Sequence, residues 1–475
     1  SPSASTTAQG LRKPAPVRRN KGVKILLEIH DKAKENFNKK ATELLSLVKQ
    51  LEIDRDNVKE EVDENTQPYI SATLTEKEII GEITIGYTDG FGVDRGKAFH
   101  INKNRYGIID DDYTVFLNVV SNLYSIKQVG SILSIKFLKD NLFTWIKNSY
   151  INGVEVEYID FLLSNADQVV QEHKIWLPIP FTRIGKDFSL GKISFVTITK
   201  SLIDDWFSLG EKMSSDPSNV QKLEEFKNRI RKDFQGYAAG VFSCIAESTR
   251  AVELAYENFT NSLNLLRVFS GANLVHEISN GAYEYGHKMI RMEKYFIKKG
   301  DIISYSEGII DKSIHWNIQR HDVDWMAKYF KKLNILLCED ILNNYQEKLL
   351  ESLIIYSKSC LRYDISDKIL YILVALETML LRNSSEPIQQ NVGERLAFVI
   401  EKDPIKRKEN VKILKDIYEV RSKFIHHGRS ISENTELLRN FMNRAWIFFL
   451  TLIDYIDKYS TKEEFLDDID ILKYS

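Results

Sequence analysis

Cysteine is scarce in this chain of 475 residues, and the placement of the few cysteines excludes two kinds of site. Cys244, Cys338 and Cys360 lie far apart and form neither a Cys-x-x-Cys pair nor the Cys/His spacing of a zinc site. We therefore expect neither a metal centre built on cysteine nor disulfides. The spacing is typical of reduced, buried thiols in a cytoplasmic protein.

Long apolar runs are also missing. No uninterrupted stretch reaches the roughly 20 residues that cross a bilayer, and no apolar core of a signal peptide follows the N-terminus. These absences predict a cytoplasmic location and no membrane partner.

Neither sign of charge dominates the sequence. The formal net charge of −2 excludes a uniformly basic nucleic-acid coat, so nucleic-acid contacts would have to come from local basic patches. What the chain does contain is 43% hydrophobic and 28% charged residues, the composition of a globular protein. Its length exceeds that of one ordinary core, so two or three domains are expected.

The pattern of residues changes along the chain and predicts five segments. Residues 1–22, rich in Ser, Thr, Ala and Pro and free of acids, are expected to be a disordered basic tail. Residues 23–65 show the spacing of a helical segment, and 66–200 are expected to be a β-rich domain with a helix or two inserted. The helical period then returns, predicting a helical linker domain over 201–340 and a helical C-terminal domain over 341–475.

Six β-branched or aromatic segments between Gly, Asn and Asp turns are the predicted strands: 69–74, 79–87, 113–120, 154–161, 174–178 and 193–199. The predicted later helices are 246–269, 287–299, 341–361, 366–382, 391–402, 408–427 and 433–458, the last with a capping box over 430–433. The glycines of 86–96 have only a weak likeness to a dinucleotide fingerprint, and a β-turn is the better interpretation. The fold class is α+β: a β-rich N-terminal domain, a helical middle region and a C-terminal helical bundle.

The predicted helix 408–427 carries the residues best suited to chemistry. Its expected buried stripe is Ile413, Ile417, Val420 and Phe424, at i, i+4, i+7 and i+11. Arg421 stands at the edge of that stripe. His426 and His427 follow in the last turn, before Gly428, a residue suited to end a helix.

A local excess of positive charge surrounds this helix. Eight Lys or Arg residues, among them Lys415 and Lys423, fall between 402 and 423, against four acidic residues. Arginine offers phosphate a planar fork, and histidine exchanges protons near neutral pH. RNA cleavage without a metal needs a base for the 2′-OH, an acid for the departing 5′-oxygen and a fixed cation. The segment therefore predicts an RNA-cleaving site without metal or cofactor.

The pattern Arg421-Ser422-x-x-x-His426 resembles the R-x4-6-H motif of HEPN domains, in which a polar residue usually follows the arginine. The order of the surrounding helical segments is similar to that of the Apea-like branch of this superfamily. The resemblance covers about 340–460 and is most specific at 375–377 and 421–428. It implies an all-α HEPN helical bundle over the C-terminal domain.

HEPN families are mostly RNases of toxin–antitoxin, CRISPR and abortive-infection systems, usually dimers with both motifs in one cleft. The resemblance thus implies a metal-independent endoribonuclease of bacterial antiphage defence, with tRNA as a candidate substrate and a homodimer as the expected state. Arg421 and His426 would be catalytic, Ser422 a supporting polar group, and Glu377 the acid that orients the arginine. His427 stands where many relatives have Gly and competes with His426. The β-rich domain would sense a phage-derived or other trigger, or grip RNA.

Helix geometry gives a separate reason to expect a dimer. Five residues along an ideal helix turn the side chain by about 140°, so Arg421 and His426 do not share a face. A two-fold dimer relaxes this demand, since the arginine of one protomer can meet the histidine of the other.

Other interpretations stay open. The C-terminal domain could be a binding and dimerisation module without catalysis, or the protein a structural subunit of a larger assembly. His287, Arg291, Lys294 and Lys298 stand at helical spacing and could follow an RNA backbone, or form a solvated helix face. The acidic residues of 463–470 could shield the basic site or act as a solubilising end.

Overall fold

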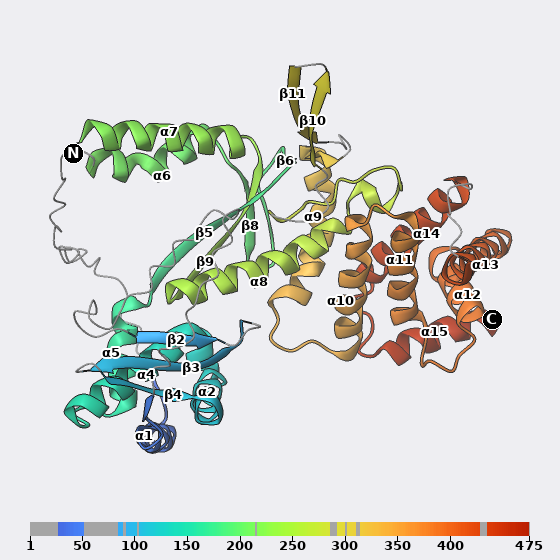
Figure 1. Ribbon diagram of the computed structural model, residues 1–475. Helices are drawn as coiled ribbons and strands as arrows, with labels where there is room; N and C mark the ends of the chain where they lie inside the picture. The colour runs from blue at the N-terminus through green and yellow to red at the C-terminus, as the bar shows by residue number, and fades with distance from the viewer. Residues whose placement is uncertain are drawn as a thin grey trace. The chain divides into compact units, whose positions relative to one another are not determined.

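The computed structural model shows a mixed α and β protein (Figure 1). The residues that it describes are 27–51, 84–88, 92–101, 104–213, 216–285, 292–299, 302–309, 314–427 and 435–474. The chain splits into two compact units. Unit 1 is Ser1–Glu172 with Ile245–Ala251, and unit 2 is His173–Cys244 with Val252–Ser475. The expected tail 1–22 lies outside the described residues.

Unit 1 combines an antiparallel sheet with helices. The sheet has the order β1 (Lys49–Leu51), β4 (Asn104–Ile109), β3 (Asp94–Ile101) and β2 (Thr84–Thr88). The helices are α1 (Asp31–Leu45), α2 (Asp110–Tyr124), α3 (Lys127–Gly130), α4 (Ile135–Asn152) and α5 (Tyr158–Val169). Phe99 of the sheet packs against Phe143 of α4, which in turn contacts Phe116 of α2. This aromatic cluster joins the sheet and the helices in one core.

Two predicted strands of this region are wrong. Segment 113–120 lies within α2, and 154–161 runs from a loop into α5. In α2 the buried side chains of Tyr113, Phe116 and Val120 recur at i, i+3 and i+7, which is a helical period. Three aspartates in the first turn favour the helix through its dipole. Helical packing therefore outweighs the β-branched and aromatic composition on which the strand prediction rested.

Other strand predictions hold. Segment 174–178 lies inside β5 (Gln171–Ile179), 193–199 contains β8 (Ile193–Thr197), and the end of 79–87 falls in β2. β2 and β3 pair antiparallel, so the glycine-rich stretch between them joins two strands rather than opening a helix. Segment 69–74 lies outside the described residues.

Unit 2 contains a second sheet, of order β5-β9-β8-β7, with β7 at Phe188–Leu190 and β9 at Ala238–Ala246. β6 (Thr182–Ile184) pairs in parallel with β12 (Trp316–Ile318). α6 (Lys200–Met213) and α7 (Pro217–Phe234) precede β9, and α8 (Ser248–Arg267) follows it. The long helix predicted over 246–269 is thus confirmed as α8, whereas β9 is an element that the sequence pattern did not predict.

The helix predicted over 287–299 is wrong in its described part. Residues Met292–Lys299 form strand β10, which pairs antiparallel with β11 (Ile302–Ile309). Lys294 stands opposite Glu307 in this hairpin, so Lys294 and Lys298 are not one helical turn apart. Arg291 and His287 lie outside the described residues. Tyr295, Phe296 and Ile297 are aromatic or β-branched residues, which favour strands, and pairing with β11 prevails over the helical spacing of the basic residues.

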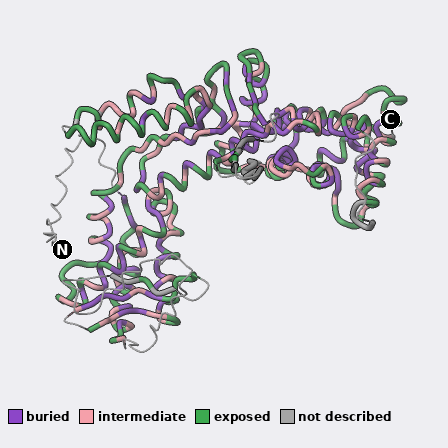
Figure 2. Tube along the Cα trace, turned by 45° about the horizontal axis from the view of Figure 1, so that its top comes forward, coloured by how far each residue is buried: buried purple, intermediate pink, exposed green. Residues whose placement is uncertain are grey.

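The predicted C-terminal helices form with small shifts of their bounds. They are α10 (Asn344–Ser357), α11 (Ile365–Leu380), α12 (Ile388–Ile400), α13 (Pro404–His427) and α14 (Thr435–Asp454). The sequence pattern did not predict α9 (Arg320–Cys338) or α15 (Lys462–Tyr474) as separate helices. Buried positions recur along these helices (Figure 2). Asn343 caps α10 through a reciprocal pair with Gln346, and Asp364 caps α11. The capping box predicted over 430–433 lies outside the described residues.

The expectation of buried cysteines is correct for Cys360 and wrong for the other two, because Cys244 is half-buried and Cys338 is exposed. None of the described helices has both the length and the apolar character needed to cross a membrane.

Candidate functional site

The buried face of α13 differs from the predicted stripe. Leu414 and Ile417 are fully buried and Tyr418 is 8% exposed, whereas Ile413 and Val420 are only half-buried. The side chain of Phe424 lies outside the described residues. The stripe is therefore turned toward Leu414 and Tyr418, because α13 packs against α11, α12 and α14 together. Arg421, at i+7 from Leu414 and i+3 from Tyr418, continues this buried face.

Glu377, in the last turn of α11, meets two residues of this face. The Tyr418 hydroxyl donates a hydrogen bond of 2.9 Å to Glu377 Oε1. Arg421 Nη1 lies 4.0 Å from the same oxygen. The structure thus brings Arg421 together with the acid that the sequence assigned to it. Both side chains are partly buried, Arg421 at 31% and Glu377 at 19% exposure, so their attraction is screened less than that of a surface pair.

Tyr418 is a member of the site that sequence reasoning missed. Burial raises the pKa of its hydroxyl, and the neighbouring Glu377 charge raises it further, so the phenol stays protonated and remains a donor at neutral pH. Its position three residues before Arg421 was the available signal, because residues i and i+3 share a helix face.

The Arg421 guanidinium makes no hydrogen bond to Glu377, whose Oε1 atom already accepts the bond from the Tyr418 hydroxyl. At 4.0 Å its contact with Glu377 is a charge pairing and not a hydrogen bond. Arg421 Nε is buried and has no hydrogen-bond partner among the described residues. Glu377 attracts this arginine without forming hydrogen bonds to its guanidinium. The guanidinium is therefore suited to bind an anion such as phosphate.

The other predicted site residues stand in different surroundings. Ser422 is exposed, as is Lys423, which pairs with Glu419 at 2.8 Å one turn away. Lys415 is exposed two turns before Arg421. His426 and His427 are the last two residues of α13, and their side chains lie outside the described residues. Of the other two RNA-binding candidates, Lys294 belongs to β10 and Arg291 is not described.

Within the described ranges, which leave out the two histidine side chains, no three His, Cys, Asp or Glu residues gather as a metal ion would require.

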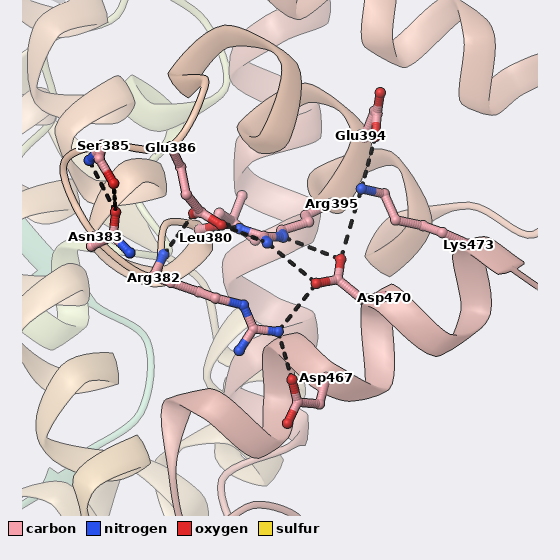
Figure 3. A network of polar contacts seen from close by, with 10 residues as sticks. All are labelled: Leu380, Arg382, Asn383, Ser385, Glu386, Glu394, Arg395, Asp467, Asp470 and Lys473. Atoms are coloured by element: carbon pink, nitrogen blue, oxygen red, sulfur yellow. Dashed lines mark hydrogen bonds and ion pairs between the residues drawn. The ribbon is translucent and has the colours of Figure 1, made fainter.

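A charge network centred on the buried Arg395 holds the chain just after Glu377 (Figure 3). Arg395 of α12, whose side chain is 4% exposed, donates to the Leu380 carbonyl at 2.6 Å and to both oxygens of Glu386 at 2.9 and 3.0 Å. It also lies 3.3 Å from Asp470 of α15. Arg382 extends the network to Asp467 at 2.6 Å and Asp470 at 3.1 Å. The network ties α11, α12 and α15 together beside the site.

The acidic residues of 463–470 belong to α15, and some of them have partners that the sequence does not reveal. Asp470, 28% exposed, pairs with Arg395 and Arg382, and Asp467, 64% exposed, pairs with Arg382. Asp468 pairs with Lys458 at 3.1 Å, and Glu464 accepts the Ser460 backbone N–H at the start of α15. Buried arginines need such partners, and the sequence reveals the acids without revealing what they face.

The network predicts an acid-sensitive fold. The hydrogen bond from Arg395 lowers the pKa of Glu386; burial opposes ionisation of Asp470, but bonds from Arg395 and Arg382 still hold its pKa below the ordinary value. Carboxyls with depressed pKa values stabilise the fold above their ordinary pKa, and this contribution is lost as the pH falls through the folded value. We expect the urea midpoint to be steady between about pH 7 and pH 5 and to fall below about pH 4.5.

The Glu386→Gln variant separates this network from the other carboxyls of the chain. It should be less stable than the wild type at neutral pH and should lose less stability on acidification. A pH profile parallel to that of the wild type would contradict the assignment.

Comparisons of the chain with protein-family models, with curated proteins and with solved structures find no match.

Proposed function

We propose that the C-terminal helices form a metal-independent endoribonuclease of the HEPN type, in which Arg421 binds the phosphate that is cleaved. One observation carries the proposal: the Arg421 guanidinium lies 4.0 Å from Glu377, whose oxygen is already bonded by Tyr418. This arrangement orients a cation without occupying its donors. His426 and His427 follow Arg421 in the same helix, five and six residues further on.

The reaction follows from these groups. A histidine removes the proton of a ribose 2′-OH, and the 2′-oxygen forms a bond to the adjacent phosphorus. The bond from phosphorus to the 5′-oxygen breaks, and a protonated histidine delivers a proton to that oxygen. The products are a 2′,3′-cyclic phosphate and a 5′-hydroxyl. Arg421 offsets the negative charge that gathers on the phosphorane oxygens, an effect of about 10²–10³ in rate for one donor.

Two copies of the chain are part of the proposal. Arg421 and His426 are about 140° apart around an ideal helix, so a single α13 turns them to different sides. In a two-fold dimer, Arg421 of one protomer and a histidine of the second copy would complete each site.

The proposed setting is bacterial antiphage defence by abortive infection, in the cytoplasm, with tRNA as the first substrate to test. This part rests on the HEPN resemblance of the sequence. Unit 1 would then receive the trigger that releases cleavage.

The experiment is incubation of the purified full chain with total RNA in EDTA. The proposal expects cleavage that leaves 2′,3′-cyclic phosphate ends, detected by resistance of the 3′ ends to ligation until the cyclic group is removed. Intact RNA under these conditions, with the chain folded, dimeric and supplied with infected-cell extract, would instead favour a binding and dimerisation module.

A further inference from the structure

A hollow of about 390 Å³ lies between the first turn of α12 and the middle of α13. Its lining residues are Pro387, Ile388, Gln389, Gln390, Val411 and Lys415. Ligand pockets in proteins range from about 300 to 1,000 Å³, so the hollow is large enough for one nucleoside and too small for a folded segment.

Lys415 lines the hollow and lies on the helix that carries the proposed cleavage site. It precedes Arg421 by six residues, about 9 Å of helix rise and about 120° around the helix. RNA bound in the hollow would therefore reach Arg421 by passing along and around α13.

The wall formed by α12 is held in place. Glu386, the residue before Pro387, is bonded through both carboxylate oxygens by Arg395, whose side chain is 4% exposed. Its Oε2 also accepts the Arg382 backbone N–H at 2.8 Å. The first turn of α12 is thus fixed before any ligand arrives, which lowers the entropic cost of binding.

The lining has the chemistry of a nucleobase site. Pro387, Ile388 at 37% exposure and half-buried Val411 provide apolar surface for the face of a base. Lys415 is exposed and provides positive charge for a phosphate. Two amides face the hollow, and they differ: Gln390 Nε2 is bonded to Glu394 at 2.9 Å, whereas Gln389 makes only a long 3.4 Å contact with the Lys415 carbonyl.

Resting on the proposed function, we infer that this hollow binds a base of single-stranded RNA close to the cleavage site and on the same helix, with Gln389 selecting the base and Lys415 holding its phosphate. A glutamine amide forms a two-bond pair with adenine, donating to N7 and accepting from N6. Adenine is therefore the expected preference. Gln389 is a specificity residue and takes no part in proton transfer.

The experiment uses the full chain and labelled hexamers of 2′-O-methyl adenosine, uridine and cytidine. These lack the attacking hydroxyl, so binding is measured without cleavage. Fluorescence anisotropy should show the tightest binding for the adenosine hexamer. Gln389→Ala should weaken that binding about tenfold and remove the preference. Lys415→Ala should weaken all three hexamers alike and reduce the slope of log affinity against log salt by about one.

Lys406→Ala is the matched charge control, because Lys406 is exposed on the opposite side of α13, nine residues before Lys415. It should bind as the wild type does. Unchanged affinities and ratios in Gln389→Ala would overturn the inference, even if the wild type cleaves RNA. A different result would be a wild type that binds with a base preference that depends on Gln389 and yet cleaves no RNA. That result would support the base-binding site and contradict the proposed activity.

Discussion

Replacement of Arg421 by alanine is expected to lower RNA cleavage by about a thousandfold, because the phosphorane loses its fixed cation. Removal of one long side chain at 31% exposure should leave the helices intact, as circular dichroism and the thermal midpoint would report. Single-turnover cleavage of total RNA in EDTA measures the effect. Lys406→Ala, an exposed charge on the same helix, should cleave at the wild-type rate. Unimpaired cleavage by Arg421→Ala would contradict the assignment of Arg421 as the group that binds the cleaved phosphate.

Mixing two inactive variants tests whether each site is shared between protomers. Arg421→Ala and His426→Ala proteins, combined in equal amounts under conditions of subunit exchange, should regain about one quarter of wild-type cleavage. Half of the dimers would then be mixed, and each mixed dimer would hold one complete site. Recovery absent despite exchange, or a strict monomer in light scattering with full activity, would contradict the shared arrangement. Repeating the mixture with His427→Ala identifies the histidine that transfers the proton.

Replacement of Arg395 by methionine is expected to lower the free energy of unfolding by about 3 kcal/mol or more. The arginine is 4% exposed, and its loss leaves the Leu380 carbonyl and the Glu386 and Asp470 carboxylates without their central partner. For a unit as large as unit 2, the thermal midpoint should fall by about 5 °C. Calorimetry of the full chain measures this shift of the thermal midpoint.

Lys348→Met is the control for that experiment. Lys348 pairs with Glu351 one turn away on α10, at 42% and 51% exposure, so its loss should cost at most about 0.5 kcal/mol. Equal midpoints for both variants would show that the network around Arg395 contributes no more than a surface pair.

The C-terminal helices were predictable because their apolar periods are long and their caps are local. Asn343 and Asp364 cap helices that the sequence placed within a few residues. The N-terminal half was less predictable because short aromatic and β-branched runs occur in both strands and buried helices. Segment 113–120 is helical because Phe116 and Val120 are buried on one helix face. Met292–Lys299 is a strand because it pairs with β11.

The part of the site that was predictable is the part that follows from the sequence of α13 and from the family resemblance. The pairing of Glu377 with Arg421 was anticipated, although the two residues come from different helices. The role of Tyr418 and the hollow at Gln389 were not anticipated, since both arise from how α13 turns against its neighbours. A single residue of helical rotation decides which side chains meet, and sequence spacing alone does not fix it.

The charge network around Arg395 also sets an order of events during translation. The chain is made from its N-terminus, so Arg421 leaves the ribosome well before Asp467 and Asp470. Until α15 has been made, Arg395 and Arg382 lack part of their counter-charge, and the chain after Glu377 lacks its full support. The segment after Glu377 should therefore become firmly held only when α15 is in place.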